Sequence, residues 1–245
     1  MRSGAVRLLG PALAALLLAG CAERASPSEG GRTQVSGDDA SGSTTPAPSA
    51  PAPGETTSET TSGEPVASGP AVSDGRPAVA ALSIPRLGIR GLRVVPYRGM
   101  TDDAPGTAIQ NGGRAASPHG PRGGVGPGGV GNYQVTAHRL SSTRAFEFLP
   151  RLSRGDEVSL VARGTRYVYR ITTTRRTSFR SPPSLREQRA AVPGRPGVRP
   201  TRAMITLSTC ATIEDHAAGN FWADEFDNPE HRIDKIGVLV RTRAV

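Results

Sequence analysis

From about Ala80 onward, the sequence is a series of short apolar runs separated by glycine and proline. The runs read "AALSIPRLGI", "GLRVVPY", "NYQVTAH", "DEVSLVA", "TRYVYRITT", "RAMITLST" and "IDKIGVLVR". Their length and their β-branched and aromatic content are typical of strands. In the fifth run, Tyr167, Tyr169 and Ile171 fall on one face, which indicates an antiparallel strand with one buried side. Seven or eight such strands in residues 80–245 predict a single all-β barrel or sandwich.

Helix is expected at one place, "TRAFEFLPRL" at residues 143–152, where Phe146 and Leu149 could cover one end of a barrel. Two long segments lie outside the strand-like runs, at residues 99–131 and 175–202. Long segments without regular structure in a compact domain are usually functional or mobile. We therefore expect some of the functional surface to come from these two loops.

A glycine-rich stretch contains the pattern GxGxxG, at Gly126, Gly128 and Gly131. In dinucleotide-binding folds this pattern follows a strand and opens a helix, whose N-terminus holds the pyrophosphate. Here a strand-like run follows it instead. We interpret the stretch as a surface loop and expect no cofactor and no bound metal.

The first 21 residues have the features of an export signal. Arg2 and Arg7 precede an apolar run that is too short and too rich in small residues for a membrane-spanning helix. The four residues that end this segment, "LAGC", resemble a bacterial lipobox, in which Cys21 receives a diacylglycerol and becomes the new N-terminus. Two acyl chains can hold a protein at a membrane surface. We expect a lipid-anchored protein at the extracellular face of the plasma membrane; the alternative is an ordinary secretory signal.

Residues 22–79 are dominated by Ser, Thr, Pro, Gly and Ala and contain no aromatic residue, so they are predicted to be a disordered linker. The folded domain is then residues 80–245. Of the total formal charge of +9, residues 1–21 hold +2 and the linker holds −5, which leaves +12 on the folded domain. For an exported protein, this charge favours contact with anionic membrane and wall polymers rather than with nucleic acid.

Cys210 is the only cysteine besides Cys21, so it has no intramolecular disulfide partner if Cys21 is acylated or removed. A lone thiol outside the cell is either a small buried hydrophobe or a reactive group. A reactive thiol needs an imidazole or a cation beside it and a donor for the oxyanion. His138, Cys210 and Arg232 each lie at the end of a different strand-like run, so they can meet at one rim of a barrel. His216 is a rival base.

The motifs around these residues resemble those of the sortase family. "TLSTC" resembles the TLxTC signature of sortases, "NYQVTAHR" resembles the strand that carries their catalytic histidine, and "SIPRLGI" resembles the first strand of their barrel. The order His, Cys, Arg matches as well. The segments "HRLSSTRAFEFLPRLSRGDEVSL" and "RYVYRI" extend the resemblance over roughly residues 80–241. Within the family the sequence is most similar to the class E sortases, although it has "AHR" where many members have GHR.

This resemblance implies a closed eight-stranded β-barrel with one or two short helices. It implies an enzyme of the hydrolase class, a cysteine transpeptidase and endopeptidase that cleaves the Thr–Gly bond of a sorting signal of the LPxTG or LAxTG type. Cys210 forms a thioacyl intermediate, His138 is the general acid and base, and Arg232 donates hydrogen bonds to the oxyanion or substrate. The partners are then the sorting signals of secreted proteins and a peptidoglycan precursor amine, and the protein is expected to be a monomer in a Gram-positive cell envelope.

Some features depart from the family pattern. The loop "EDHAAGNFWADEFDNPEH" places Arg232 farther from Cys210 than usual, so Lys235 is an alternative cation. Sortases usually have a transmembrane helix, whereas this sequence has a lipobox and a linker. The acidic residues of the loop either contact solvent or bind an ion; they are Glu214, Asp215, Asp224 and Asp227.

Two further residues are candidates for substrate binding. Thr209 lies next to the candidate nucleophile, and Trp222 lies with Phe221 in the extended loop, where the aromatic rings line a groove or anchor the loop. The alternative function is a non-catalytic lipoprotein that binds cell-wall peptides.

Overall fold

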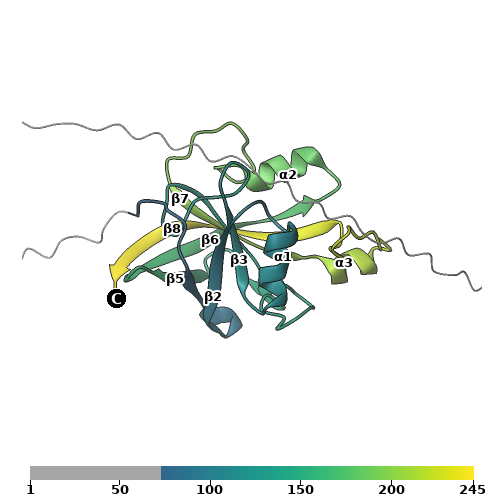
Figure 1. Ribbon diagram of the computed structural model, residues 1–245, viewed down its shortest axis with the longest axis horizontal. Helices are drawn as coiled ribbons and strands as arrows, with labels where there is room; N and C mark the ends of the chain where they lie inside the picture. Colours follow the sequence, from purple (N-terminus) through teal and green to yellow (C-terminus); the bar gives the residue numbers. More distant parts are fainter. Residues whose placement is uncertain (1–72) are drawn as a thin grey trace, which may run out of the picture. The chain divides into compact units, whose positions relative to one another are not determined.

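The computed structural model describes residues 73–245, which fold into a closed barrel of eight strands (Figure 1). The strands are β1 (Ala80–Ile84), β2 (Ile89–Arg98), β3 (Ala115–His119), β4 (Gly131–Thr136), β5 (Glu157–Ala162), β6 (Thr165–Ser178), β7 (Ala203–Cys210) and β8 (His231–Ala244). The expected all-β barrel is confirmed. The strand-like run that begins at Ala80 forms two strands, because a 3₁₀ turn, η1 (Pro85–Leu87), separates β1 from β2.

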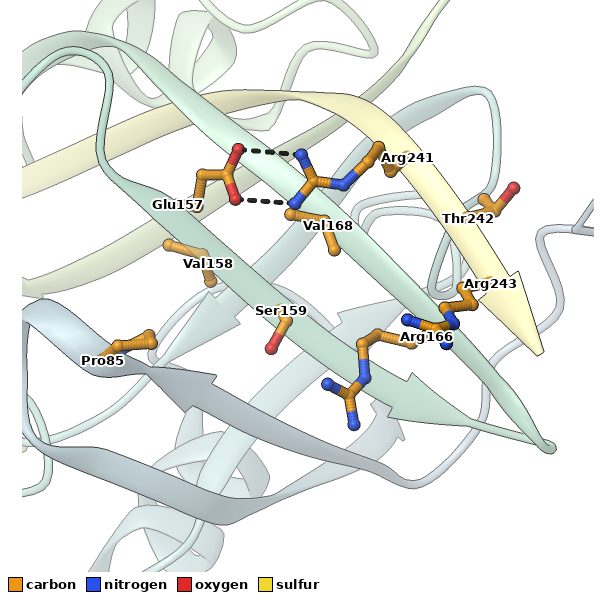
Figure 2. A pocket seen from close by; sticks show the side chains of 9 residues that line it. All are labelled: Pro85, Glu157, Val158, Ser159, Arg166, Val168, Arg241, Thr242 and Arg243. Atoms are coloured by element: carbon orange, nitrogen blue, oxygen red, sulfur yellow. Dashed lines mark hydrogen bonds and ion pairs between the residues drawn. The ribbon is translucent and has the colours of Figure 1, made fainter. Parts of the chain in front are cut away.

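The order of the strands around the barrel is β1-β2-β3-β4-β7-β8-β6-β5. Two neighbouring pairs are parallel, β2 with β3 and β4 with β7, and the other pairs are antiparallel. A parallel pair needs a long connection, because the chain must return to the same end of the sheet before the second strand starts. Residues 137–202 make that connection between β4 and β7, and β5 and β6 form within it. Figure 2 shows part of the outer surface where β5, β6 and β8 lie next to one another.

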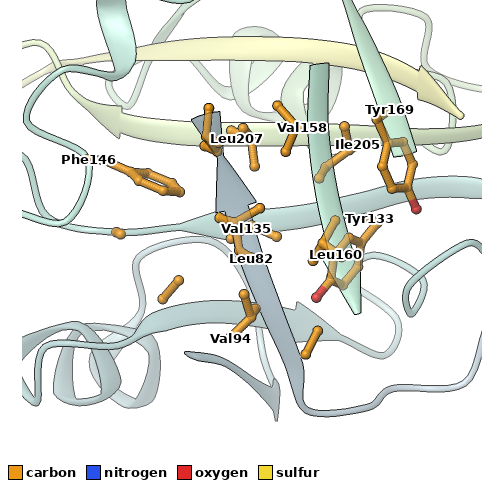
Figure 3. Packing of buried hydrophobic residues seen from close by; sticks show 14 of the residues in the cluster. Leu82, Val94, Tyr133, Val135, Phe146, Val158, Leu160, Tyr169, Ile205 and Leu207 are labelled. Atoms are coloured by element: carbon orange, nitrogen blue, oxygen red, sulfur yellow. The ribbon is translucent and has the colours of Figure 1, made fainter. Parts of the chain in front are cut away.

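The barrel interior is filled by the inward-facing residues of alternate strand positions (Figure 3). On β6, Tyr167, Tyr169 and Ile171 are all buried, as their period-two spacing predicts. Burial of one large apolar side chain contributes about 1.5–3 kcal/mol to stability. Other members of this core are Leu82, Val94, Tyr133, Val135, Val158, Leu160, Ile205 and Leu207.

The helix predicted for residues 143–152 is wrong. This segment forms a single 3₁₀ turn, η2 (Leu149–Arg151), with Pro150 in its first turn. Proline has no N–H to donate within a helix, so it can begin a helix but cannot lie inside one without disrupting it. Phe146 and Leu149 are nevertheless fully buried, as members of the core cluster.

The α-helices of the described residues lie in the connections between strands instead: α1 (Ala104–Asn111), α2 (Pro182–Arg189) and α3 (Thr212–Ala217). The first two begin at capping residues. The Asp103 carboxylate accepts a hydrogen bond from the Gly106 amide at 3.0 Å, and the Ser181 hydroxyl caps α2 in the same way. Proline in the first turn of each helix suits the position, where the amide has no partner in the helix.

One outer face of the barrel carries buried polar side chains. Because side chains alternate along a strand, the polar residues of β4, β7 and β8 share the face opposite the core. The Ser208 hydroxyl lies 2.6 Å from one Asp234 oxygen, and the amide of Gln188 in α2 donates to the same oxygen at 3.0 Å. Burial raises the pKa of Asp234, against the effect of these hydrogen bonds. The segment containing α2 therefore covers part of a polar sheet face.

Residues 73–79, which the sequence analysis places in the linker, contact the barrel. The Ser73 hydroxyl donates to the Pro127 carbonyl at 2.5 Å, and the Gly126 amide donates to the Gly75 carbonyl at 2.7 Å. The signal segment, Cys21 and residues 22–72 of the linker lie outside the described residues. Within residues 73–245, none of the helices has the length and apolar character needed to cross a bilayer.

Candidate functional site

Two of the three candidate catalytic residues lie at the same level of the barrel rim. Strands β4 and β7 are parallel neighbours, and their pairing runs to Thr136 opposite Ser208. The Ala137 amide then donates to the Ser208 carbonyl at 3.3 Å. His138 and Cys210 each lie two residues past this last pair, so the parallel register brings them to the same rim. The sequence places His138 at the end of its strand, and it lies just beyond that end.

His138 and Cys210 both line one cavity of about 240 Å³. Its walls come from α1, from the segment after β4, from the end of β7 and from the loop before β8. The other lining residues are Thr107, Asn111, Arg139, Leu140, Ser141, Thr212, Phe226, Asp227, Asn228 and Pro229. The cavity therefore combines a thiol and an imidazole with walls that include both polar and apolar groups.

The imidazole of His138 is half-buried and hydrogen-bonded at one nitrogen. Its Nε2 lies 2.7 Å from the Asn111 Oδ1 at the end of α1. An amide oxygen can only accept, so Nε2 carries the proton in this contact and Nδ1 is the basic nitrogen. Burial lowers the pKa of His138; Asp102 opposes this shift and Arg232 adds to it.

Cys210 is partly exposed at the cavity, but most of its thiol is surrounded by protein, which favours the neutral form. Burial raises the pKa of the Cys210 thiol, and the positive charge of Arg232 opposes that shift only in part. Burial also lowers the pKa of His138, so both shifts favour the uncharged form of the side chain. A neutral thiol beside a neutral imidazole is the dominant resting form near pH 7.

Arg232 is the cross-strand partner of Cys210 in the antiparallel pair of β7 and β8. Its side chain is fully buried, with Nε donating to an Asp102 oxygen at 2.8 Å and Nη1 donating to the Pro229 carbonyl at 2.8 Å. The guanidinium carbon lies 4.0 Å from the ring centre of Phe179. Its Nη2 is buried and has no hydrogen-bond partner among residues 73–245. One donor group of a rigidly held cation is therefore free.

Asp102, which holds Arg232, is not among the candidate residues that the sequence indicates. This residue is 8% exposed and has a backbone φ of 56°, a conformation that aspartate tolerates better than most residues. One carboxylate oxygen accepts from Arg232 and the other accepts from the Gln110 amide at 3.0 Å. The only signal in the sequence is the turn-like "TDDAPG" before α1.

The alternative cation, Lys235, contacts a different part of the barrel. It lies three positions after Arg232, so the two side chains point to opposite faces of β8. Its cross-strand partner is Leu207, which is in the core. The ammonium donates to the Pro150 carbonyl at 3.0 Å, to the Leu152 carbonyl at 2.6 Å and to the Thr174 hydroxyl at 3.0 Å. All three of its donors are satisfied, and Lys235 does not face Cys210.

Arg139 connects the histidine segment to the cysteine segment. It is buried, and its Nη1 donates to the Cys210 carbonyl at 3.2 Å. The same guanidinium forms a two-pronged pair with the Glu214 carboxylate on α3. This pair lowers the pKa of Glu214. Because Arg139 follows His138 directly, these bonds fix the backbone of both candidate catalytic residues.

The two candidate substrate-binding residues, Thr209 and Trp222, do not line the cavity that contains Cys210. Thr209 is buried and its hydroxyl donates to the Ala137 carbonyl at 2.8 Å. Trp222 is half-buried, with the Arg180 guanidinium carbon 5.8 Å from its ring centre. Phe226 of the same loop lines the cavity instead. The rival base His216 is exposed and lies against the ring of Phe221 at a centroid distance of 4.9 Å.

Three of the four acidic residues of the extended loop have side-chain partners in the described structure, and the fourth, Asp227, lines the cavity. Asp215 is buried, bonds to Arg176 and accepts from the His231 amide at 2.9 Å. Asp224 accepts from the Phe226 amide and from the Asn228 amide, both at 2.9 Å. The bonds of Glu214 and Asp215 thus hold α3 to the rest of the barrel, while those of Asp224 stabilise a turn within the loop.

A comparison with protein-family models matches the sortase domain at residues 82–222. The chain belongs to the sortase family. As a sortase, it is a cysteine transpeptidase, and the barrel described above is the fold of this family.

Solved structures agree with this assignment of the fold. The barrel is similar to the SrtA sortase from Actinomyces oris, with 18% identity, a TM-score of 0.52, and coverage of 74% of this chain and 89% of that one. It is similar to sortase E1 from Streptomyces coelicolor, solved with a tripeptide in the active site, at 20% identity and a TM-score of 0.50 over 71% of this chain and 94% of that one. Sortase E from Streptomyces avermitilis matches at 25% identity and a TM-score of 0.49, over 71% and 93%. No curated protein matches the chain.

Proposed function

We propose that this sortase is of the class E type and joins secreted proteins to the cell wall. It cleaves the Thr–Gly bond of an LPxTG-like or LAxTG-like sorting signal and transfers the threonyl carbonyl to a peptidoglycan precursor amine. The observation that carries the proposal is the placement of the Cys210 thiol and the His138 imidazole in one cavity, with Arg232 as the cross-strand partner of Cys210. The class assignment rests on the motifs of the sequence.

In the first half of the reaction, the Cys210 proton passes to Nδ1 of His138. The thiolate then attacks the threonyl carbonyl carbon, and the carbonyl oxygen takes up the negative charge. When this tetrahedral species collapses, the bond to glycine breaks and the imidazolium of His138 gives its proton to the leaving amine. The product is a thioacyl enzyme at Cys210 and a free glycine amine.

The second half reverses these roles. An acceptor amine attacks the thioacyl carbon and loses a proton to the neutral imidazole of His138. The new amide forms as the Cys210 thiolate leaves, and the thiolate recovers a proton from His138. Because each proton taken up by His138 is given back within the same half, the enzyme returns to its neutral resting pair.

Arg232 stabilises the oxyanion in both halves. The contact to Asp102 and the contact to the Pro229 carbonyl fix its guanidinium, which leaves the buried Nη2 without a partner in the described part of the chain. A donor that is fixed before the reaction and surrounded by little water stabilises developing negative charge far better than a mobile one. We assign this role to Arg232 rather than to Lys235.

The N-terminal segment places the enzyme at its substrates. Residues 1–21 act as a lipoprotein signal, Cys21 carries the lipid, and the linker up to residue 72 separates the barrel, with the residues 73–79 that contact it, from the extracellular face of the membrane. The sequence patterns described above support this arrangement. Labelling of cells with a fatty acid tests it: the wild-type chain is expected to take up the label, and Cys21→Ala is expected to lose it.

The directions of the two pKa shifts predict a broad pH profile. Burial lowers the pKa of His138 below its ordinary value of 6.5 and raises that of Cys210 above 9.0. Below the His138 pKa the neutral imidazole that takes the Cys210 proton is lost, and above the Cys210 pKa the proton that His138 passes to the leaving amine is lost. We expect kcat/KM to be nearly constant from pH 6.5 to 9, since this ratio reports the free enzyme. A profile in which kcat/KM falls on both the acidic and the basic side within that range contradicts the prediction. The rate of thiol alkylation, measured against pH, gives the pKa of Cys210 separately.

Mass spectrometry of the full chain with sorting peptides tests the function. LAxTG and LPxTG peptides are each incubated with the protein, with and without a peptidoglycan-like amine. We expect the mass of the acyl part of the peptide on the enzyme, its transfer to the amine, and a preference for one motif. If neither an adduct nor cleavage appears with either peptide, the result favours the alternative function, a lipoprotein that binds wall peptides without turnover.

A further inference from the structure

A second pocket lies on the outer face of β5, β6 and β8, away from the catalytic rim. It has a volume of about 480 Å³ and opens to solvent (Figure 2). In the strand order of the barrel, β5 and β6 are not neighbours of β4 or β7, the strands that lead to His138 and Cys210. Its lining residues are Pro85, Glu157, Val158, Ser159, Arg166, Val168, Arg241, Thr242 and Arg243. The pocket is therefore lined by three arginines and one carboxylate.

The carboxylate at one end of the pocket is already fully engaged. Arg241 donates to both oxygens of Glu157, at 2.8 and 3.3 Å, as the two dashed lines in Figure 2 show. Arg170, on the neighbouring strand, donates to Glu157 at 3.2 Å. The hydrogen bonds from Arg241 and Arg170 lower the pKa of Glu157, so this group is ionised near pH 7. One negative charge is thus shared by two guanidinium groups.

The other end of the pocket holds two arginines without such a partner. Arg166 on β6 and Arg243 on β8 are direct cross-strand partners. Figure 2 shows them together at the end of the pocket opposite the pair of Glu157 and Arg241. Neither forms a salt bridge or a side-chain hydrogen bond to any residue between 73 and 245. Like charges directly opposite each other destabilise a strand pair, and a bound anion removes that penalty.

A phosphate group fits this end of the pocket. Positions directly opposite in an antiparallel pair are only about 4.5–5.5 Å apart, so two side chains can reach one anion. Each guanidinium offers a planar fork that matches two oxygens of a phosphate, and Ser159 adds a hydroxyl on the pocket lining. We propose that the pocket binds the phosphate group of a phosphate ester or diester, held between Arg166 and Arg243. The source is either a phosphodiester polymer or a lipid headgroup.

The test uses the full chain and a variant that lacks both guanidinium groups, Arg166→Gln/Arg243→Gln. Binding of inorganic phosphate is measured by calorimetry, and phosphate is also expected to raise the Tm of the wild type. We expect the variant to bind phosphate at least about tenfold more weakly, because charge-assisted hydrogen bonds are lost. Its Tm without phosphate should be equal or higher, because the variant removes a like-charge pair. A second variant, Arg166→Lys/Arg243→Lys, keeps the charge without the fork and is expected to bind with intermediate affinity.

The matched control is Arg195→Gln/Arg199→Gln, which removes the same charge from exposed positions in the loop between α2 and β7. It is expected to bind phosphate like the wild type. If phosphate affinity falls equally in the control and in Arg166→Gln/Arg243→Gln, the effect is one of general charge and the proposal is wrong. Unchanged phosphate affinity in Arg166→Gln/Arg243→Gln also overturns it. Binding of soluble poly(glycerol phosphate) and of vesicles of anionic lipid is then measured with the wild type and with Arg166→Gln/Arg243→Gln. The probe whose binding is lost in the variant identifies the source of the phosphate group. Cleavage of a soluble sorting peptide should be unchanged in all these variants, so the result is independent of the proposed catalytic function.

Discussion

Replacing Cys210 with alanine is expected to remove the covalent adduct with a sorting peptide and to lower transpeptidation at least about 10⁴-fold. No other cysteine lies in the described residues, so another thiol cannot replace it there. The loss of one sulfur atom from a partly exposed position leaves the core untouched, so stability should change by about 1 kcal/mol or less. Intact-mass measurement after incubation with peptide, together with the initial rate of amine transfer, checks the prediction.

Peptide affinity separates loss of chemistry from loss of the site. Cys210→Ala should bind a sorting peptide nearly as well as the wild type, because the walls of the cavity remain. Thr212→Ala, which removes a small polar group from the same cavity, serves as a matched control and should retain most of the activity. If Cys210→Ala still transfers peptides at the wild-type rate, Cys210 is not the nucleophile.

The second large effect concerns the buried pair of Arg232 and Asp102. Arg232→Gln leaves the Asp102 carboxylate buried without its cation, and breaking a buried pair in this way costs about 3–5 kcal/mol of stability. We expect the double variant Asp102→Asn/Arg232→Gln to recover most of that stability, because no charge is then left unpaired. Urea unfolding of the wild type, both single variants and the double variant measures the coupling directly.

Activity should not follow stability in this series. Without a guanidinium, the oxyanion loses its fixed donor, and removal of one such donor typically lowers kcat about 10²–10³-fold. The double variant is therefore expected to fold well and to remain slow, with peptide affinity little changed. Recovery of kcat along with stability in the double variant would mean that Arg232 supports the fold only and does not contact the reacting atoms.

The sequence alone predicts the barrel and most of its core, because apolar runs and alternation are local patterns, but β3 lies in residues 99–131, which the sequence indicates as a loop. It also predicts Cys210, His138 and Arg232 as candidates, since each lies at or next to a strand end and carries a reactive or charged group. The helices α1 and α2 were not predicted, although Asp103 and Ser181 are ordinary capping residues. Proline and glycine in both segments favoured a loop interpretation, whereas a proline in the first turn favours a helix.

The partners of the candidate residues were beyond sequence reasoning for a different reason. Asp102 and Arg232 are 130 positions apart and Arg139 contacts a backbone carbonyl at Cys210, a group that every residue has. No local pattern encodes such contacts; they depend on the strand order of the barrel. Asn111 is likewise the last residue of a short helix and carries no signal of its role beside His138. The sequence thus indicates the candidate residues one by one. The contacts that hold them in place follow only from the three-dimensional structure.

The parallel pairing of β4 and β7 affects how the enzyme gains its activity as it folds. Contacts between residues far apart in the sequence form late, because closing a long loop costs entropy before the contact provides any stabilisation. Cys210 and His138 meet only where β7 pairs with β4, and the β5–β6 hairpin lies in the chain between those two strands. A newly made chain therefore carries a thiol without its imidazole partner until the barrel closes, and catalytic activity reports completion of folding.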